Sequence, residues 1–243
     1  MKYLNFANPV SGNGKPEFLM TLIDLSPSMD EGDWKPSRRE GAIKANIELI
    51  ELKAKYHPQD TVGVIGFGSH AKLLHRSVKI GDNSKSVRDS LKKTPSPSGT
   101  NFTAALQMAE DCLFGKNNPV ISNCFKKSLK QTLAELFYEP NPWDIRTIKG
   151  NCAVDGITRR IVMLTDGEHN GSESPQLVAD RLKNAGVVID CIGIGGTPTD
   201  VDEQLLNTIA SRNSDGTIRY CFIGDQQALI RKYETLARHI RPV

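Results

Sequence analysis

The sequence is poor in features that mark several common classes of protein. Its five cysteines are an odd number and none stands in C-x-x-C spacing, so neither a disulfide framework nor a zinc site is indicated. No apolar run approaches the ~20 residues that span a membrane. The first residues do not form a charged segment followed by an apolar one. We therefore expect a soluble, untargeted chain in a reducing, cytoplasmic compartment.

The net charge is also small. It is +3, from 31 basic and 28 acidic residues distributed along 243 residues. No basic stripe with interleaved aromatic residues occurs, so we expect neither a nucleic-acid partner nor a membrane surface as partner. The length suits a single α/β domain that carries an insertion and buries a sizeable core.

Strands alternate with helices along most of the chain. Apolar or β-branched runs predict strands at 18–23, 61–67, 160–165, 187–195 and 218–223, with an edge pair or one bent edge strand at 71–80. Helical spacing predicts helices at 33–56, 84–93, 102–113, 175–185, 201–211 and 226–239. Asp33 and the pair Thr199-Asp200 are the predicted N-terminal caps of two of these helices. The alternation predicts an α/β fold with a mainly parallel central sheet of about six strands and helices on both faces.

The chain is organised around the end of the first predicted strand. There Asp24, Ser26 and Ser28 follow at every second residue. Open α/β sheets bind ligands outside the carboxyl ends of their strands, and these three side chains carry the oxygen ligands that Mg²⁺ prefers. Taken alone, the motif fits an ordinary strand-to-helix turn equally well.

Two later stretches add matching oxygens. Thr100 stands just before a predicted helix, and Asp166 follows the apolar run 161–164. In this order the three stretches resemble the von Willebrand factor type A domain and its metal-ion-dependent adhesion site (MIDAS), whose pattern is D-x-S-x-S, then a Thr, then an Asp. All five positions match, and the resemblance extends from about Glu17 to about His239.

The resemblance implies a doubly wound, Rossmann-like sheet with one short antiparallel edge strand. It implies that Ser26 and Ser28 bind Mg²⁺ or Mn²⁺ through their hydroxyls and that Thr100 does so directly or through water. Asp24 and Asp166 would act through waters or as close carboxylates. One position on the ion would stay open for an acidic residue of a partner protein.

The domain organisation expected from this reading is simple. Residues 1–16 form an N-terminal arm, 17–239 a single domain and 240–243 a tail. Residues 115–158 exceed what the alternation needs and form an insertion, with one predicted helix at 124–137. Because the insertion returns to the strand that ends at Asp166, we expect it at the end of the sheet opposite the metal loops.

Three function classes fit these observations. The first is a metal-dependent protein-interaction module that is not an enzyme. The second is a metal-assisted phosphate hydrolase, which is disfavoured because there is no P-loop, no G-x-S-x-G and no His or Cys paired with a base near Asp24. The third is a structural subunit of a larger intracellular assembly, for example with an AAA+ ATPase, in which the ion holds three loops together.

The residues near the motif have simpler interpretations. Asp30, Glu31 and Asp33 read as a solvated loop and a helix cap. Residues 168–170 are expected on the rim of the metal face, where His169 reads as an exposed polar residue that could touch a partner.

Overall fold

The computed structural model describes residues 16–92, 94, 97–115 and 157–238. The predicted helix at 124–137, nearly all of the N-terminal arm and the tail lie outside the described residues.

A six-stranded sheet with the order β3-β2-β1-β4-β5-β6 forms the centre of the structure. Its strands are β1 (Glu17–Asp24), β2 (Thr61–Phe67), β3 (Ala71–Lys79), β4 (Thr158–Thr165), β5 (Val188–Ile194) and β6 (Tyr220–Ile223). β3 pairs antiparallel with β2, with an irregular register, and the other neighbours pair in parallel. β1, β2, β4 and β5 are buried on both faces, which is why they read as unbroken apolar runs. The predicted fold class is confirmed.

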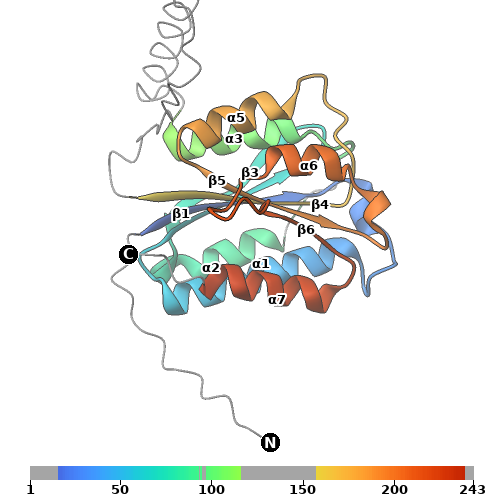
Figure 1. Ribbon diagram of the computed structural model, residues 1–243. Helices are drawn as coiled ribbons and strands as arrows, with labels where there is room; N and C mark the ends of the chain where they lie inside the picture. Colours follow the sequence, from blue (N-terminus) through green and yellow to red (C-terminus); the bar gives the residue numbers. More distant parts are fainter. Residues whose placement is uncertain (1–15, 93, 95–96, 116–156, 239–243) are drawn as a thin grey trace, which may run out of the picture.

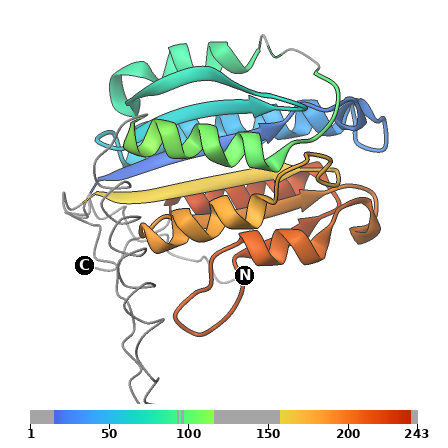
Figure 2. The ribbon, with the colours of Figure 1, turned by 90° about the horizontal axis from the view of Figure 1, so that it is seen from above.

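Helices cover both faces of the sheet (Figure 1). One face carries α1 (Arg38–Tyr56), α2 (Ile80–Leu91) and α7 (Gln226–Arg238). The other carries α3 (Phe102–Phe114), α5 (Pro175–Asn184) and α6 (Glu203–Ile209), which lie in succession across the sheet when it is seen from above (Figure 2). Each layer buries its own apolar cluster against the sheet, so the domain has two cores separated by the strands.

The strand order places a reversal of direction at β1. The chain leaves β1 for β2 on one side, and β4 later returns to pair with β1 on the other side. In such sheets the crevice at the carboxyl ends of the two central strands is the ligand-binding position. Because Ile23 pairs with Leu164, Asp24 lies beside Thr165 at this crevice.

Two predicted helix caps were wrong. α1 begins at Arg38, and its N-cap is Ser37, which accepts a hydrogen bond from Glu40 N, rather than Asp33. α6 is capped by Asp202 rather than by Thr199-Asp200, which form the short 3₁₀ helix η2 (Pro198–Asp200). The carboxylates of Asp33 and Asp200 are instead hydrogen-bonded to the Arg38 side chain.

Other helix and strand boundaries differ from the predicted ones by a few residues. α2 begins at Ile80, four residues before the predicted start. The predicted edge segment is one continuous bent strand, β3.

A buried charge cluster closes the end of the sheet opposite the crevice. Lys53 Nζ lies 2.5 Å from Glu17 Oε2 and 2.9 Å from Asp60 Oδ2, and all three side chains are almost fully buried. The cluster fixes α1 to the starts of β1 and β2. The insertion rejoins the described chain at the same end, because Thr158 pairs with Glu17; the placement of the insertion itself stays a prediction.

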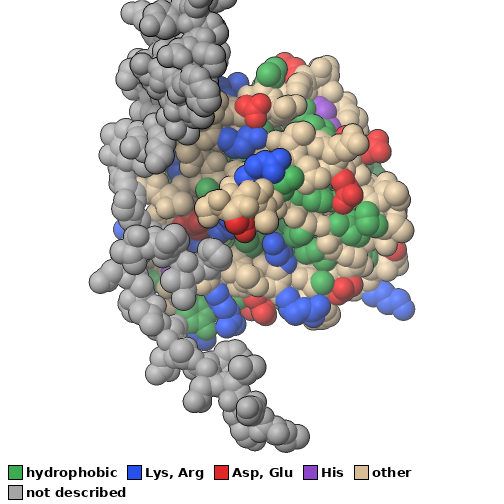
Figure 3. Space-filling view, in the orientation of Figure 1, with side chains coloured by type: hydrophobic (Ala, Val, Ile, Leu, Met, Phe, Trp, Pro, Cys, Tyr) green, Lys and Arg blue, Asp and Glu red, His purple; other side chains and the backbone are tan. Residues whose placement is uncertain are grey.

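None of the described helices is both long and apolar enough to cross a membrane. On the face seen in Figure 3, basic and acidic side chains are interspersed.

Lys53→Met should destabilise the fold strongly, because it leaves Glu17 and Asp60 buried without the lysine. Breaking a buried ion pair from one side costs about 3–5 kcal/mol. Urea denaturation should show this loss, whereas Lys44→Met, on an exposed position of the same helix, should change the unfolding free energy by less than about 0.5 kcal/mol. Equal effects of the two substitutions would contradict a structural role for the cluster.

Candidate metal centre

Asp24 joins the loops that follow β1 and β4. Its side chain is fully buried at the end of β1. Oδ1 accepts a hydrogen bond from Ser26 N at 2.8 Å, and Oδ2 accepts one from Thr165 Oγ1 at 2.6 Å. The first contact turns the chain back on itself after the strand. The second fixes this turn to the neighbouring strand, so the two loops that carry the motif are held together.

Three oxygens contact one another in succession across these loops. Ser26 Oγ lies 3.0 Å from Ser28 Oγ, which donates a hydrogen bond to Asp166 Oδ1 at 2.9 Å. The short 3₁₀ helix η1 (Pro27–Asp30) positions the two serines, and its fully buried Met29 anchors it to the core. The structure therefore brings together four of the five predicted residues, although Asp24 and Asp166 are separated by most of the sequence.

Thr100 lies next to this group. Its backbone N donates to Asn170 Oδ1 at 2.8 Å, and Asn170 N donates to Thr100 O at 2.9 Å, so the loop before α3 is fixed to the loop after β4. A Cβ at Gly167 would lie 3.4 Å from Thr100 Oγ1, which shows that this hydroxyl faces the residue after Asp166. Among the described residues, no hydrogen bond joins the Thr100 side chain to the other four predicted ligands.

The donor set fits a small divalent cation. Neighbouring ligands of an octahedral Mg²⁺ ion lie about 3 Å apart, because each is about 2.1 Å from the ion and at right angles to the next. The spacings Ser26 Oγ to Ser28 Oγ and Ser28 Oγ to Asp166 Oδ1 have this value. All the groups are hard oxygen donors, the type that Mg²⁺ and Mn²⁺ prefer.

The two carboxylates are costly to keep ionised in this place. Burial raises the pKa of Asp24 to about 6, although hydrogen bonds from Thr165 and Ser26 favour the charged form and the charge of Asp166 opposes it. Burial also raises the pKa of Asp166, against the lowering effect of Ser28 and Arg38. A bound cation would stabilise both carboxylates in the charged form.

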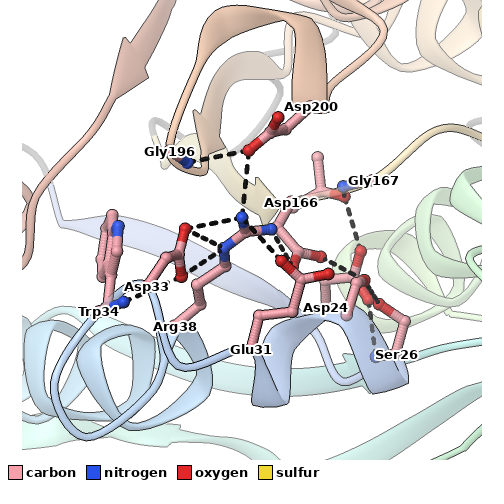
Figure 4. A network of polar contacts seen from close by, with 12 residues as sticks. Asp24, Ser26, Glu31, Asp33, Trp34, Arg38, Asp166, Gly167, Gly196 and Asp200 are labelled. Atoms are coloured by element: carbon pink, nitrogen blue, oxygen red, sulfur yellow. Dashed lines mark hydrogen bonds and ion pairs between the residues drawn. The ribbon is translucent and has the colours of Figure 1, made fainter.

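Arg38 is a charged residue of the site that sequence reasoning missed. Figure 4 shows its guanidinium in contact with the carboxylates of four acidic residues, Glu31, Asp33, Asp166 and Asp200. Arg38 Nη1 donates to Asp166 Oδ2 at 3.1 Å. Burial lowers the pKa of Arg38, but hydrogen bonds to Asp33 and Asp166 raise it by more, so the residue stays charged.

The acidic residues after the motif are exposed, as expected, but each also pairs with an arginine of α1. Glu31 and Asp33 pair with Arg38, and Asp30 pairs with Arg39, which also donates to the carbonyls of Leu25 and Ser26. These ion pairs fasten the start of α1 to the loop that carries the two serines. The sequence analysis did not predict these ion pairs, because the arginines stand on the next element, α1.

His169 has a structural role that was not predicted from the sequence. Its Nδ1 accepts a hydrogen bond from Phe102 N at 3.1 Å, its Nε2 lies 2.9 Å from Glu173 O, and its ring lies against Phe102. Asn101 caps the same helix by accepting from Ala104 N. His169 therefore helps to hold the first turn of α3, and with it Thr100. Glu168 is exposed on the rim, as expected.

Comparison with known proteins decides the family. A family model described as the von Willebrand factor type A domain matches residues 19–169, which is more than half of the chain and includes all five predicted metal ligands. The chain belongs to the von Willebrand factor type A family. A second model of the same description matches residues 125–229.

Solved structures support the type A fold at low sequence identity. A structure of proximal thread matrix protein 1 from the mussel byssus with a zinc-occupied MIDAS motif has a TM-score of 0.61 at 15% identity, over 92% of this chain and 48% of that one. A von Willebrand factor type A protein from Catenulispora acidiphila has a TM-score of 0.62 at 15% identity, over 92% and 42%. The SpRpn10 VWA domain has a TM-score of 0.57 at 19% identity, over 89% and 95%. The chain thus spans less than half the length of the first two.

In chelator, Asp24 should make the stability of this type A domain fall as pH rises. Its folded pKa of about 6 lies above the ordinary 3.8, so its stabilising contribution is present below about pH 4 and is lost as pH rises through 6. Asp24→Asn cannot ionise. Relative to the wild type, its unfolding free energy should therefore increase by roughly 2.5 kcal/mol between pH 4 and pH 7, because most of the shift of about two pKa units, at 1.36 kcal/mol each, falls in this range.

Urea denaturation in chelator across this pH range measures the difference. Asp82→Asn, which removes an exposed carboxylate on α2, controls for the loss of a surface charge. A difference between Asp24→Asn and wild type that stays constant or shrinks with rising pH would show that Asp24 is not the costly buried charge described above.

Proposed function

We propose that this chain is a metal-ion-dependent protein-interaction module. Asp24, Ser26, Ser28, Thr100 and Asp166 hold Mg²⁺ or Mn²⁺, and an acidic residue of a partner protein occupies the open position on the ion. The bound ion supplies a positive centre at the surface of the crevice. The chain's own residues position that centre, and no catalytic step is assigned to them.

The observation that supports this proposal most is the succession of oxygen contacts from Ser26 to Ser28 and from Ser28 to Asp166. These oxygens have the spacing of adjacent octahedral ligands, and they lie at the carboxyl ends of the two central strands. Two of the three are neutral hydroxyls. A shell with so little negative charge leaves the ion able to attract one more anion, which is the basis for expecting a partner carboxylate.

The hydrogen bonds of the site favour this role over a purely structural ion. Thr165 to Asp24, Ser28 to Asp166 and the pair of bonds between Thr100 and Asn170 already join the three loops. An ion is therefore not required to hold the loops together. A subunit role in a larger assembly, such as one with an AAA+ ATPase, is compatible with the same interaction site.

The neighbouring histidine does not supply the general base of a hydrolase. A metal-assisted hydrolase needs a general base beside the bound water. His169 is the histidine that follows Asp166 most closely, and its two ring nitrogens contact the backbone of Phe102 and Glu173. It is therefore committed to the fold of the α3 start rather than available as a base.

Several features of the whole protein belong to the same proposal. Residues 17–239 form one domain with an insertion at 115–158, between the arm 1–16 and the tail 240–243. The cytoplasm is the proposed location. The chain spans less than half the length of two of the similar structures, so a role as one domain or subunit of a larger assembly belongs to the proposal as well.

Mg²⁺ and Mn²⁺ should bind to the wild type and stabilise it. Linkage requires a gain of about 2.7 kcal/mol at one hundred times the dissociation constant. Ser28→Ala removes the oxygen that contacts both Ser26 and Asp166, and it should weaken binding by at least about 10–100-fold, the loss typical for residues that support a metal site. Isothermal calorimetry with the metal alone measures the effect.

Ser86→Ala is the matched control, because Ser86 is an exposed serine on α2 and lies outside the site. It should bind Mg²⁺ as the wild type does. If folded wild-type protein gives no binding with either metal at millimolar concentration, the metal site does not exist.

The open position should accept a carboxylate. With Mn²⁺ bound, water-proton relaxation reports water exchanging at the ion, and titration with acetate should reduce it to a plateau as the carboxylate replaces that water. Chloride at equal ionic strength should not do so. Glu168→Gln, on the exposed rim, should behave as the wild type. A relaxation rate unaffected by acetate would remove the carboxylate contact from the proposal and favour a structural ion.

A further inference from the structure

Asp166 depends on its ion pair with Arg38 more than Arg38 does. The Asp166 side chain is fully buried, and the pair with Arg38 Nη1 is its contact with a positive charge. Its other oxygen, Oδ1, faces Ser28. An ionised carboxylate in such a position is expensive unless a cation stands beside it.

The Arg38 guanidinium contacts other carboxylates besides that of Asp166. Its Nε donates to both oxygens of Asp33 at 3.0 Å, and its Nη2 lies 2.7 Å from Asp33 Oδ2. The same Nη2 lies 3.1 Å from Glu31 Oε2 and 3.1 Å from Asp200 Oδ2. Three carboxylates besides Asp166 therefore hold the guanidinium in place, as Figure 4 shows.

Asp200 is itself held independently of Arg38. Its Oδ2 accepts from Gly196 N at 2.8 Å, and its Oδ1 accepts from Thr197 Oγ1 at 2.9 Å. Loss of the Asp166 contact would leave Arg38 anchored to Asp33 and to this loop. The ion pair is therefore needed to stabilise the Asp166 carboxylate, but it is not needed to hold Arg38 in place.

We infer that Arg38 is the resident counter-ion of Asp166, and that its fixed charge stabilises the metal-free domain and lowers the affinity of the site for divalent cations. This rests on the proposed metal site. A cation that binds at Asp166 must compete with a permanent positive charge a few ångströms away. Arg38 therefore lets the domain stay folded without the ion, so that metal occupancy, and with it partner binding, varies with the concentration of the cation.

Loss of the Arg38 charge should have opposite effects on stability and on metal affinity. Arg38→Gln should melt at a lower temperature than the wild type in chelator, because Asp166 loses its counter-ion. It should bind Mg²⁺ at least about tenfold more tightly, since the repulsion between two nearby positive charges is gone. Arg38→Lys keeps the charge and should stay within about threefold of the wild-type dissociation constant, estimated from the same Coulomb term.

Arg160→Gln is the matched control. Arg160 is also a buried arginine paired with a carboxylate, Asp190, but it lies at the opposite end of the sheet, where β4 and β5 begin. Its substitution should lower the melting temperature and leave the Mg²⁺ affinity unchanged. Calorimetry with Mg²⁺ alone and thermal unfolding in chelator measure both quantities for all four proteins.

The outcomes separate this inference from the proposed function. If Arg38→Gln binds Mg²⁺ no more tightly than the wild type while Ser28→Ala abolishes binding, the metal site stands and the counter-ion role of Arg38 is overturned. If the wild type binds no metal, both are overturned.

A measurement on the wild type covers the case in which Arg38→Gln does not fold. The side-chain nitrogen resonances of Arg38 should shift when Mg²⁺ is added, because its partner Asp166 now faces the ion, and those of Arg160 should not. An unchanged Arg38 signal at saturating Mg²⁺ would overturn the inference.

Discussion

The site depends on the parallel pairing of β1 with β4. This pairing has one register, in which Ile23 lies opposite Leu164, and the next residues along the two strands are Asp24 and Thr165. The Thr165 hydroxyl then donates to the buried Asp24 carboxylate at 2.6 Å. A shift by one residue would turn every side chain of the strand to the other face and would separate these groups. It would also exchange the side chains that each strand packs into the two cores.

The second constraint is electrostatic. The fold places two carboxylates, Asp24 and Asp166, where water cannot solvate them. Hydrogen bonds from Ser26, Thr165 and Ser28 compensate in part, and Arg38 supplies one positive charge. The remaining excess of negative charge is what makes the crevice attractive to a divalent cation. The structure and the proposed function therefore share one physical cause, which is burial of acidic groups at a sheet end that the strand order leaves open.

Most of the fold could be predicted from local patterns, because the central strands are long apolar runs bounded by turn residues. The motif at Asp24 and its two later partners could be predicted as well, since each follows an element whose type was clear. The errors share one physical reason. Asp33 and Asp200 both stand before a helix, where a carboxylate locally predicts a cap, but in the structure both contact Arg38. An ion pair across 162 positions outweighs a local preference and leaves little trace in the sequence.

One signal for Arg38 was present. Arg38 and Arg39 occupy the first turn of α1, where the helix dipole disfavours positive charge, and three acidic residues precede them. Such a pair needs nearby carboxylates, so its presence indicates an ion-pair cluster at the helix start. The role of Thr165 could not be predicted in this way, because the strand register alone brings its hydroxyl into hydrogen-bonding distance of Asp24.

The central claim is that a divalent ion binds at the oxygens of Ser26, Ser28 and Asp166. A crystal of the wild type grown with Mn²⁺ tests it most directly, because anomalous scattering locates manganese without reference to the protein atoms. We expect one strong anomalous peak in contact with the Ser26 and Ser28 hydroxyls. A peak elsewhere on the domain, with the Ser28 hydroxyl still hydrogen-bonded to Asp166, would contradict it.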